Sequence, residues 1–446
     1  MYMHVSPEVV PPARKILLIA LAGAGFALTI AIFYPGIMTY DARYVYGAIA
    51  EGRAGDWQSP VMTALWALVD PVAPGSASMF MLIAALYWLA FCVIALTVGR
   101  RCFGLAIVLL ATALLSPAFA LQGSIWRDVL FANVWMLACA LAYASHGRSP
   151  TIAISLRVAA LALLILGLLL RQNALFAAPI LGAYILSPQR LQWKRLAVFY
   201  LPAVAGLYGL VQVVYYGVFD AMRQNPLHSV MVFDLGGISH FSKQNVFPVE
   251  WKPEETPLVL NDCYDPALWD VYWTRQPCSF VMARLERDKV FGSAALVSAW
   301  RSALLDHPLS YLRHRLSFMK TFLTGENLTM WTQQLDEPFG PVLTDKPVYK
   351  AFKSWHDLVK PTPLFKAGSW LLVCMFALAM VWRRRDTPAG AFVTAVCASA
   401  IVYTLTFFIF GVASDFRYAL WAAMAGSVSG VLSFCRRAGP ESTPSL

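Results

Sequence analysis

The chain has 446 residues, of which 59% are hydrophobic and only 13% are charged. Soluble proteins are roughly half apolar and a quarter charged, so this composition excludes an ordinary soluble protein and indicates a polytopic membrane protein. The formal charge of +10 comes mainly from cations beside apolar segments. Such cations contact anionic lipid headgroups, so membrane lipids are expected partners and a nucleic acid is not.

Apolar segments long enough to cross a bilayer as helices recur along the chain. The first is expected to stay in the membrane as a signal anchor, because it is longer than a signal-peptide core and no small-residue cleavage site precedes Tyr34. About ten spans are predicted, at residues 16–33, 78–98, 102–121, 129–145, 152–170, 174–187, 196–218, 364–382, 389–411 and 418–435.

Lys and Arg cluster at alternate ends of these segments, which predicts that both termini are cytoplasmic. The order of segments divides the chain into three parts. Residues 1–218 form a transmembrane module of about seven helices with a first outer loop at 34–77, residues 219–363 form an extracytoplasmic domain, and residues 364–446 form a second module of about three helices.

The first outer loop carries signals for two short helices at the membrane surface. Thr39 is a predicted N-cap, residues 40–51 a helix of about three turns, and Gly52 its C-terminal cap. Ser59 followed by Pro60 predicts the start of a second helix.

The large outer segment from residue 219 to 366 holds 16 acids and 16 bases, a balance that favours a folded domain over a charged tail. Its irregular Pro-rich and helical stretches predict a mixed extracytoplasmic domain. Cys263 and Cys278 are its only cysteines and face an oxidising compartment in this topology, so a disulfide between them is expected.

Each short outer turn between the predicted spans carries Arg or Asp, whereas none of the ten segment centres holds an ionisable residue. A single such residue is equally well explained by snorkelling to headgroups or by a helix N-terminus. The whole set indicates one shared site at the membrane boundary, where unpaired charge is costly. The turns contribute Arg127 and Asp128, then Arg171 and Asn173, then Asp415, Arg417 and Tyr418.

Carboxylates and arginines at a lipid boundary suit one class of reaction. When a sugar is transferred from a lipid phosphate to a hydroxyl or amine, a carboxylate deprotonates the acceptor and cations stabilise the leaving phosphate. Arginine fits the second task because its fork binds phosphate oxygens in pairs.

Four segments, taken in chain order, resemble a known superfamily: YPGIMTYDARYVYGAIAEGRAGDWQSPVM, WRDVLFANVW, LLLRQNALFAAP and SDFRYALW. With an acid just after the first span and a large outer domain, the chain resembles a bacterial branch of the GT-C membrane glycosyltransferases. The resemblance implies an all-α, GT-C-like polytopic fold in the bacterial inner membrane. It also implies transfer of a hexose or pentose from a polyprenyl-phosphate-linked donor to an extracytoplasmic glycan, lipid or protein.

The resemblance implies a role for each site residue. Asp41 corresponds to the catalytic acid of the first loop and acts as general base, and Asp56 is the second loop carboxylate, either an alternative base or an acceptor contact. Substrate binding falls to the remaining polar turns, with Arg417, Arg171 and Arg127 at the phosphate, Asp415 and Asn173 orienting them or binding the sugar, and Asp128 and Tyr418 completing the set.

Alternatives stay open at this stage. A transporter or lipid flippase remains the second hypothesis for function, although such proteins usually carry midplane charges or internal repeats. A structural or assembly protein predicts that the Arg and Asp turns lie apart in space. No cofactor is assigned. The sequence TYDAR has one acid where GT-C loops often carry a pair, which weakens the case for a divalent metal without removing it.

Overall fold

The computed structural model describes residues 11–325 and 343–435. All regular elements within these ranges are helices, and strand-like pairing is limited to isolated bridges. The all-α prediction is therefore confirmed. In the described part of the outer domain, short helices are joined by irregular segments, which agrees with the predicted mixture of helical and irregular stretches.

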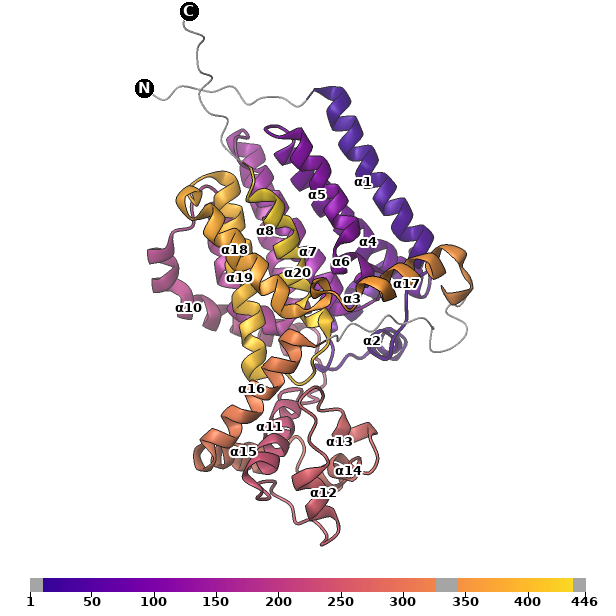
Figure 1. Cartoon of the computed structure of the whole chain (residues 1–446), viewed down its shortest axis with the longest axis vertical. Helices are drawn as coiled ribbons and strands as arrows, with labels where there is room; N and C mark the ends of the chain where they lie inside the picture. Colours follow the sequence, from indigo (N-terminus) through magenta and orange to yellow (C-terminus); the bar gives the residue numbers. More distant parts are fainter. Residues whose placement is uncertain (1–10, 326–342, 436–446) are drawn as a thin grey trace, which may run out of the picture.

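Seven helices are long and apolar enough to cross a membrane, which identifies an integral membrane protein. They form one bundle (Figure 1), with an outer body of short helices at one end. The seven are α1 (Pro12–Phe33), α4 (Ser76–Val98), α7 (Arg127–Ala144), α8 (Pro150–Leu170), α10 (Trp193–Gln212, continued to Val218), α18 (Ala367–Val381, continued to Arg384) and α19 (Pro388–Phe410).

The prediction of ten spans is too high: the described residues contain seven, or eight if a bent pair is counted as one span. That pair is α5 (Phe103–Leu115) with the segment Pro117–Gly123, bent by 48° at Ser116. The other two predicted spans form the shorter helices α9 (Ala178–Leu186) and α20 (Leu420–Leu432).

Both short helices follow polar turns that take up part of the apolar segment. The 3-10 turns η3 (Gln172–Phe176) and η8 (Phe416–Ala419) precede α9 and α20. A nine-residue helix such as α9 rises only about 14 Å, less than half of the roughly 30 Å hydrocarbon core. The missing length is occupied by the turns that carry the predicted site residues.

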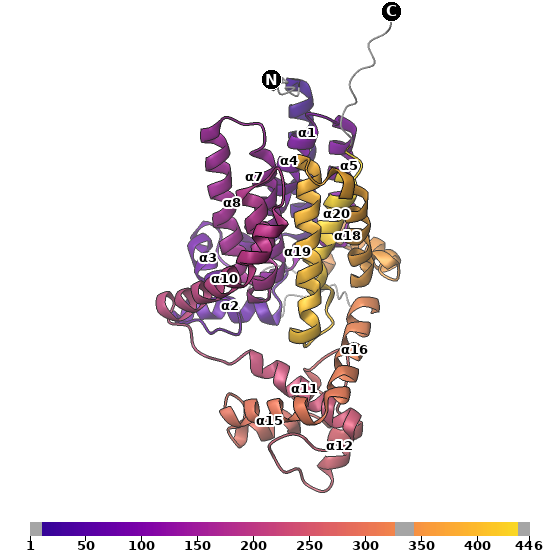
Figure 2. The ribbon, with the colours of Figure 1, turned by 90° about the vertical axis from the view of Figure 1, so that its left-hand side faces the viewer.

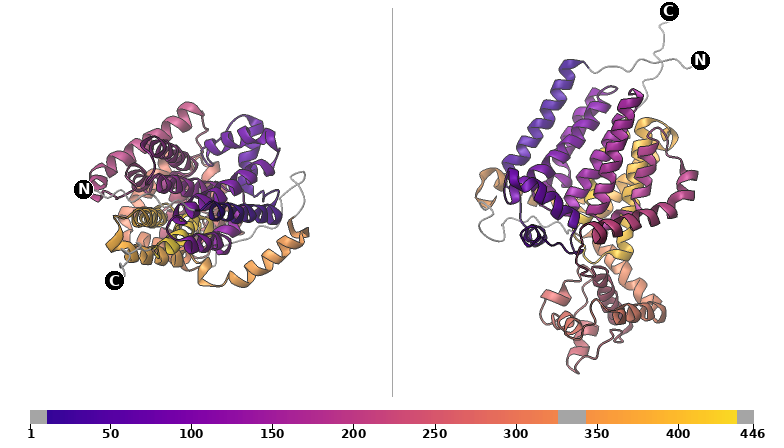
Figure 3. Two further views of the ribbon diagram at one scale, coloured as in Figure 1. Left: turned by 90° about the horizontal axis from the view of Figure 1, so that it is seen from above. Right: turned by 180° about the vertical axis from the view of Figure 1, so that it is seen from behind.

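The centre of the bundle is made by α7 and α20, which are apolar on nearly all sides. Of the most apolar stretch of α7, 89% is buried, against 6% for α10. A strongly apolar helix belongs either in a protein core or in lipid. Helix α7 lies in the core, and the exposed surface of α10 suits contact with lipid. Figures 2 and 3 show α10 running obliquely along the outside of the bundle.

The surface helices of the first outer loop are confirmed as predicted. Helix α2 spans Tyr40–Glu51, with the Thr39 hydroxyl accepting from the Ala42 N–H and Gly52 in the left-handed conformation at φ 63°. Helix α3 spans Pro60–Val69, and the Ser59 hydroxyl accepts from the Met62 N–H at 3.3 Å. The caps fix where α2 starts, and so place Asp41 in its first turn.

The outer body (Figure 1) is joined to the bundle by its last helix, α16, which packs on α18 and α19. Cys263 and Cys278 form a disulfide in this body, with Cα atoms 5.4 Å apart. Helix α17 (Pro347–Val359) falls inside the predicted outer domain but lies beside α1 at the edge of the bundle. The helices of the outer body are α11 (Leu227–Ser242), α12 (Glu255–Asn261), α13 (Val271–Thr274), α14 (Phe280–Arg287), α15 (Ala294–Asp306) and α16 (Pro308–Thr324).

Candidate active site

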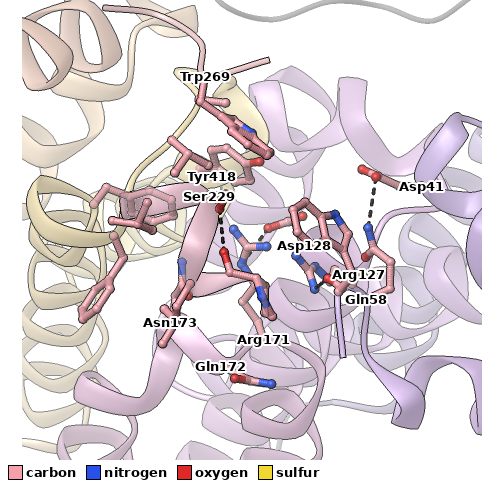
Figure 4. A pocket seen from close by; sticks show the side chains of 18 of the residues that line it. Asp41, Gln58, Arg127, Asp128, Arg171, Gln172, Asn173, Ser229, Trp269 and Tyr418 are labelled. Atoms are coloured by element: carbon pink, nitrogen blue, oxygen red, sulfur yellow. Dashed lines mark hydrogen bonds and ion pairs between the residues drawn. The ribbon is translucent and has the colours of Figure 1, made fainter. Parts of the chain in front are cut away.

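A cavity of about 240 Å³ lies where the bundle meets the outer body. Its walls come from the first outer loop, the turns before α7, α9 and α20, and the outer body, so the structure brings the predicted site residues together (Figure 4). Eight of them line the cavity: Asp41, Asp56, Arg127, Asp128, Arg171, Asn173, Arg417 and Tyr418. The ninth, Asp415, lies beside Arg417.

Asp41 forms an ion pair with Arg417 and accepts a hydrogen bond from Gln58 Nε2 at 3.0 Å, a contact visible in Figure 4. Burial raises the pKa of Asp41, but the positive charge and hydrogen bond of Arg417, helped by Arg127 and Arg171, outweigh it. The pKa therefore lies below its ordinary value of 3.8. In this arrangement Asp41 is a stable carboxylate and a weak base.

Arg417 is held by the turn in which it lies. The Asp415 carboxylate caps η8 by accepting from the Arg417 backbone N–H at 2.9 Å, and its other oxygen lies 3.4 Å from Arg417 Nε. The Arg417 guanidinium also donates to the Tyr418 hydroxyl at 3.1 Å and stands 4.9 Å from the centre of the Trp126 ring. Asp415 thus positions Arg417, in line with the orienting role that the resemblance implies.

Arg171 and Asp128 form a second ion pair, deeply buried at the ends of α8 and α7, with Arg171 Nε 3.1 Å from Asp128 Oδ1. The two atoms are close but misaligned for a hydrogen bond. The guanidinium of Arg171 lies 4.8 Å from the centre of the Tyr418 ring. Tyr418 is therefore packed between two cations of the site.

Arg127 differs from the other two arginines because it has no carboxylate partner among the described residues. Its Nη1 donates to the Trp57 carbonyl at 2.9 Å. The Nε atom of Arg127 is buried and has no hydrogen-bond acceptor in the described parts of the chain, whereas the Nε atoms of Arg171 and Arg417 lie 3.1 Å and 3.4 Å from the carboxylates of Asp128 and Asp415. Buried polar groups are seldom left unpaired, so the Arg127 donor, with two more arginines at the same cavity, suits an anion with several oxygens.

Asp56 has its carboxylate fully engaged, although it lines the cavity. One oxygen accepts from the Tyr216 hydroxyl at 2.7 Å and the other from the Gln224 backbone N–H at 2.6 Å. These bonds hold the first outer loop against the end of α10 and the segment that follows it, so the geometry favours a structural role for Asp56. Its predicted role as a base or an acceptor contact remains a prediction.

Part of the cavity lining is apolar. It includes Leu227 and Val230 at the start of α11 and Phe407 and Phe410 at the end of α19. The cavity therefore offers hydrocarbon contact and cationic contact to the same ligand, a combination that suits an amphiphilic anion.

The outer body supplies residues that the sequence analysis missed, chiefly Trp269 and Asp270. Trp269 donates its backbone N–H to the Val412 carbonyl at 2.9 Å, and Ser414 donates to the Ala267 carbonyl at 2.8 Å. These bonds fasten the outer body to the turn that carries Arg417. Asp270 is one of 16 acids in its segment, and no local pattern distinguishes it from the others.

The same turn is held from a second side by a buried cluster in the outer body. Arg315 of α16 donates to the Gly411 carbonyl at 2.7 Å and pairs with Asp234 of α11 at 2.7 Å. Asp234 also lies 3.2 Å from His314 and accepts from Trp300 Nε1 at 2.8 Å. The side chains of Asp234, His314 and Arg315 are fully buried. The outer body and the Arg417 turn are thus locked together.

Within residues 11–325 and 343–435, no three His, Cys, Asp or Glu side chains are grouped closely enough to hold a metal ion. Three of the four carboxylates that line the cavity, Asp41, Asp56 and Asp128, are already engaged by arginine, tyrosine, glutamine or backbone partners. The described residues therefore offer no built site for a divalent cation.

No family model and no curated protein matches the chain. Two solved structures are similar to it, both of ArnT from Cupriavidus metallidurans. The apo structure is 13% identical with a TM-score of 0.33 and covers 92% of this chain and 76% of its own. The structure bound to undecaprenyl phosphate is 14% identical with a TM-score of 0.32 and covers 92% and 77%. At these TM-scores the likeness supports no inference about activity.

Proposed function

We propose that this protein is an integral-membrane glycosyltransferase that moves a sugar from a polyprenyl-phosphate-linked donor to an acceptor outside the cytoplasm. The observation that carries the proposal is the convergence of three arginines, Arg127, Arg171 and Arg417, on one cavity, where Arg127 has a buried Nε–H with no acceptor among the described residues. We place the protein in the bacterial inner membrane, as the resemblance implies, with both termini in the cytoplasm, because clusters of Lys and Arg, such as Arg100 with Arg101 and Arg383 to Arg385, lie at the helix ends away from the cavity.

The donor class is inferred from the two kinds of wall. A polyprenyl phosphate has an anionic head that satisfies arginine donors and a hydrocarbon tail that needs apolar contact. Arg127, which has no ion-pair partner among the described residues, is the first candidate for the phosphate, followed by Arg171 and Arg417. The apolar side chains of α19 and α11 are close to the same space and suit the first units of the tail.

The Asp41–Arg417 ion pair suggests how donor binding prepares the reaction. A phosphate oxygen that bonds to Arg417 competes with Asp41 for the same guanidinium. As Asp41 loses its strongest positive neighbour, the effect of burial dominates and its pKa rises. Asp41 then becomes a better proton acceptor at the moment when the donor is in place, and it serves as general base toward the acceptor.

Transport and scaffolding are the competing functions. A scaffold predicts separated polar turns, and these turns meet at one cavity. A flippase needs no cleavage of the bond between sugar and phosphate, so an assay of that bond separates it from a transferase.

The test is an assay of purified protein in nanodiscs with a panel of radiolabelled polyprenyl-phosphate hexoses, N-acetylhexosamines and pentoses. The wild-type protein is expected to release polyprenyl phosphate from one of them. Asp41→Asn is expected to lower turnover by roughly 100-fold or more, the usual contribution of a general base. Glu51→Gln, an exposed acid on the same helix, is the matched control and should stay within about twofold of wild type.

Two results count against the proposal. Wild-type protein that cleaves no donor of the panel, yet moves the intact lipid across a vesicle membrane, replaces it with lipid transport. Unchanged turnover in a folded Asp41→Asn variant removes Asp41 from the reaction.

A further inference from the structure

The side of the cavity formed by the outer body carries a carboxylate that the proposed reaction does not use. Of the four acids that line the cavity, Asp41, Asp56 and Asp128 are each engaged by a cation or by hydrogen-bond donors. Asp270 has no hydrogen bond or ion pair from its carboxylate to any described residue. It is the acid still available to a ligand, just as Arg127 is the cation still available.

A structural role does not account for Asp270. It stands at the N-cap position of α13 (Val271–Thr274), where an Asp side chain commonly accepts from a backbone N–H. Here the side chain makes no such bond, and only its backbone carbonyl is used, by the N–H groups of Trp273 and Thr274. The carboxylate is therefore free for the cavity that it lines.

The position of Asp270 is fixed by its neighbour. Trp269 is almost fully buried and bonded through its N–H to the Val412 carbonyl, in the turn that leads to Arg417. The Trp269 ring also packs at 6.0 Å and 37° against the ring of Trp57 from the first outer loop. Two tryptophans from distant parts of the chain thus pack together and line the cavity beside Asp270, and Figure 4 shows Trp269 at the edge of the cavity.

Aromatic rings beside a carboxylate suit one ligand class. Sugar rings present C–H faces to tryptophan and hydroxyl edges to a hydrogen-bond acceptor. Pockets of this kind combine aromatic walls with a few placed polar groups. Burial raises the pKa of Asp270, with Asp41 adding to the rise and Arg417 opposing it. A hydroxyl donor would stabilise the charged carboxylate that the surroundings leave unsatisfied.

We propose that Trp57, Trp269 and Asp270 form the acceptor subsite and that it binds a saccharide, with Asp270 accepting a hydrogen bond from an acceptor hydroxyl. The assignment of this saccharide as the acceptor rests on the proposed glycosyltransferase function. In the transfer, a second hydroxyl of the saccharide loses its proton to Asp41 and its oxygen bonds to the anomeric carbon of the donor. The bond from that carbon to the phosphate oxygen breaks, and its electron pair leaves with polyprenyl phosphate.

The first test measures transfer by the full-length protein in nanodiscs, with the donor that the wild type cleaves. The acceptor probes are short gluco-, manno- and galacto-oligosaccharides, set against Ser- and Lys-containing peptides. An oligosaccharide is expected to take the label. Asp270→Asn is expected to raise the KM for the oligosaccharide roughly tenfold, because a charged hydrogen-bond acceptor is replaced by a neutral amide oxygen. Asp306→Asn, an exposed acid of the same outer body, should match wild type.

The second test needs no donor. Saturation-transfer NMR with the same oligosaccharides should show binding to wild type and to Asp306→Asn, and a loss of binding to Asp270→Asn. This arm separates the two proposals, because binding that depends on Asp270 in a protein that cleaves no polyprenyl-phosphate sugar refutes the transferase and keeps the saccharide site.

Three results overturn the subsite itself. The first is labelling of a peptide in place of every saccharide. The second is an unchanged saccharide KM in Asp270→Asn. The third is the absence of any NMR signal from saccharides with the wild-type protein.

Discussion

Arg315 provides a direct test of whether the outer body holds the site together. Its guanidinium is fully buried, pairs with Asp234 at 2.7 Å, and donates to the Gly411 carbonyl at 2.7 Å. Arg315→Met keeps most of the side-chain volume and removes both contacts. Asp234 then keeps only Trp300 and His314 as partners and becomes an uncompensated buried charge. Breaking one partner of a buried ion pair costs about 3–5 kcal/mol.

The assay is hydrogen exchange of the full-length protein in nanodiscs. In Arg315→Met, the opening free energy of amides in α11 and α16 is expected to fall by about 3–5 kcal/mol, and exchange in the turn at 411–415 to rise. Adding Asp234→Asn removes the buried negative charge and should restore part of the loss. The control is Arg287→Met, because the pair of Arg287 with Asp288 is exposed and should add no measurable protection.

A fall of less than about 1 kcal/mol in Arg315→Met, in the range of a surface pair, would refute the reasoning. Faster exchange in α11 and α16 without any change at 411–415 would refute the link between the outer body and the Arg417 turn.

Three further predictions concern the phosphate site, the disulfide and pH. Arg127→Lys keeps the charge but loses the two parallel N–H donors of the guanidinium, so the KM for the donor should rise about tenfold in the nanodisc assay. Arg53→Lys, on the exposed loop, should leave this KM unchanged. Equal effects of the two substitutions would remove Arg127 from the proposed phosphate site. Replacing both Cys263 and Cys278 by Ser should lower the stability of the outer body by about 3 kcal/mol in urea unfolding, as for other loops of about 15 residues, and an unchanged midpoint would contradict this. Burial lowers the pKa of His314 below its ordinary 6.5, although Asp234 opposes the shift. The unfolded chain therefore binds a proton at His314 at a higher pH than the folded chain. The contribution of neutral His314 to the free energy of unfolding should be fully present above pH 6.5 and should decline below it. A stability that does not change between pH 8 and pH 5 would contradict this prediction.

The sequence predicted local structure well where the determinants are local. Thr39, Gly52 and the Ser59–Pro60 pair set the ends of α2 and α3 because caps act within a single turn. The meeting of Asp41 with Arg417 was also predictable, since alternating spans bring every second turn to the same side of the membrane.

Features that depend on tertiary packing were not predictable. Apolar composition does not report helix length, so α9 and α20 were counted as spans although polar 3-10 turns shorten them. Asp270 reaches the cavity only because the backbone of Trp269 pairs with Val412, and no spacing in the sequence encodes that contact. Asp56 shows the converse: its position in the loop was right, but Tyr216 and Gln224 occupy its oxygens.

The Asp41–Arg417 ion pair joins residues 376 positions apart, which has a consequence for biogenesis. Asp41 is synthesised long before Arg417, and its counter-charge follows only after most of the described helices. A nascent chain that stalls before residue 417 lacks one of the three arginines that converge on the cavity. Under the proposed function, we therefore expect activity to appear only when translation has passed the turn before α20.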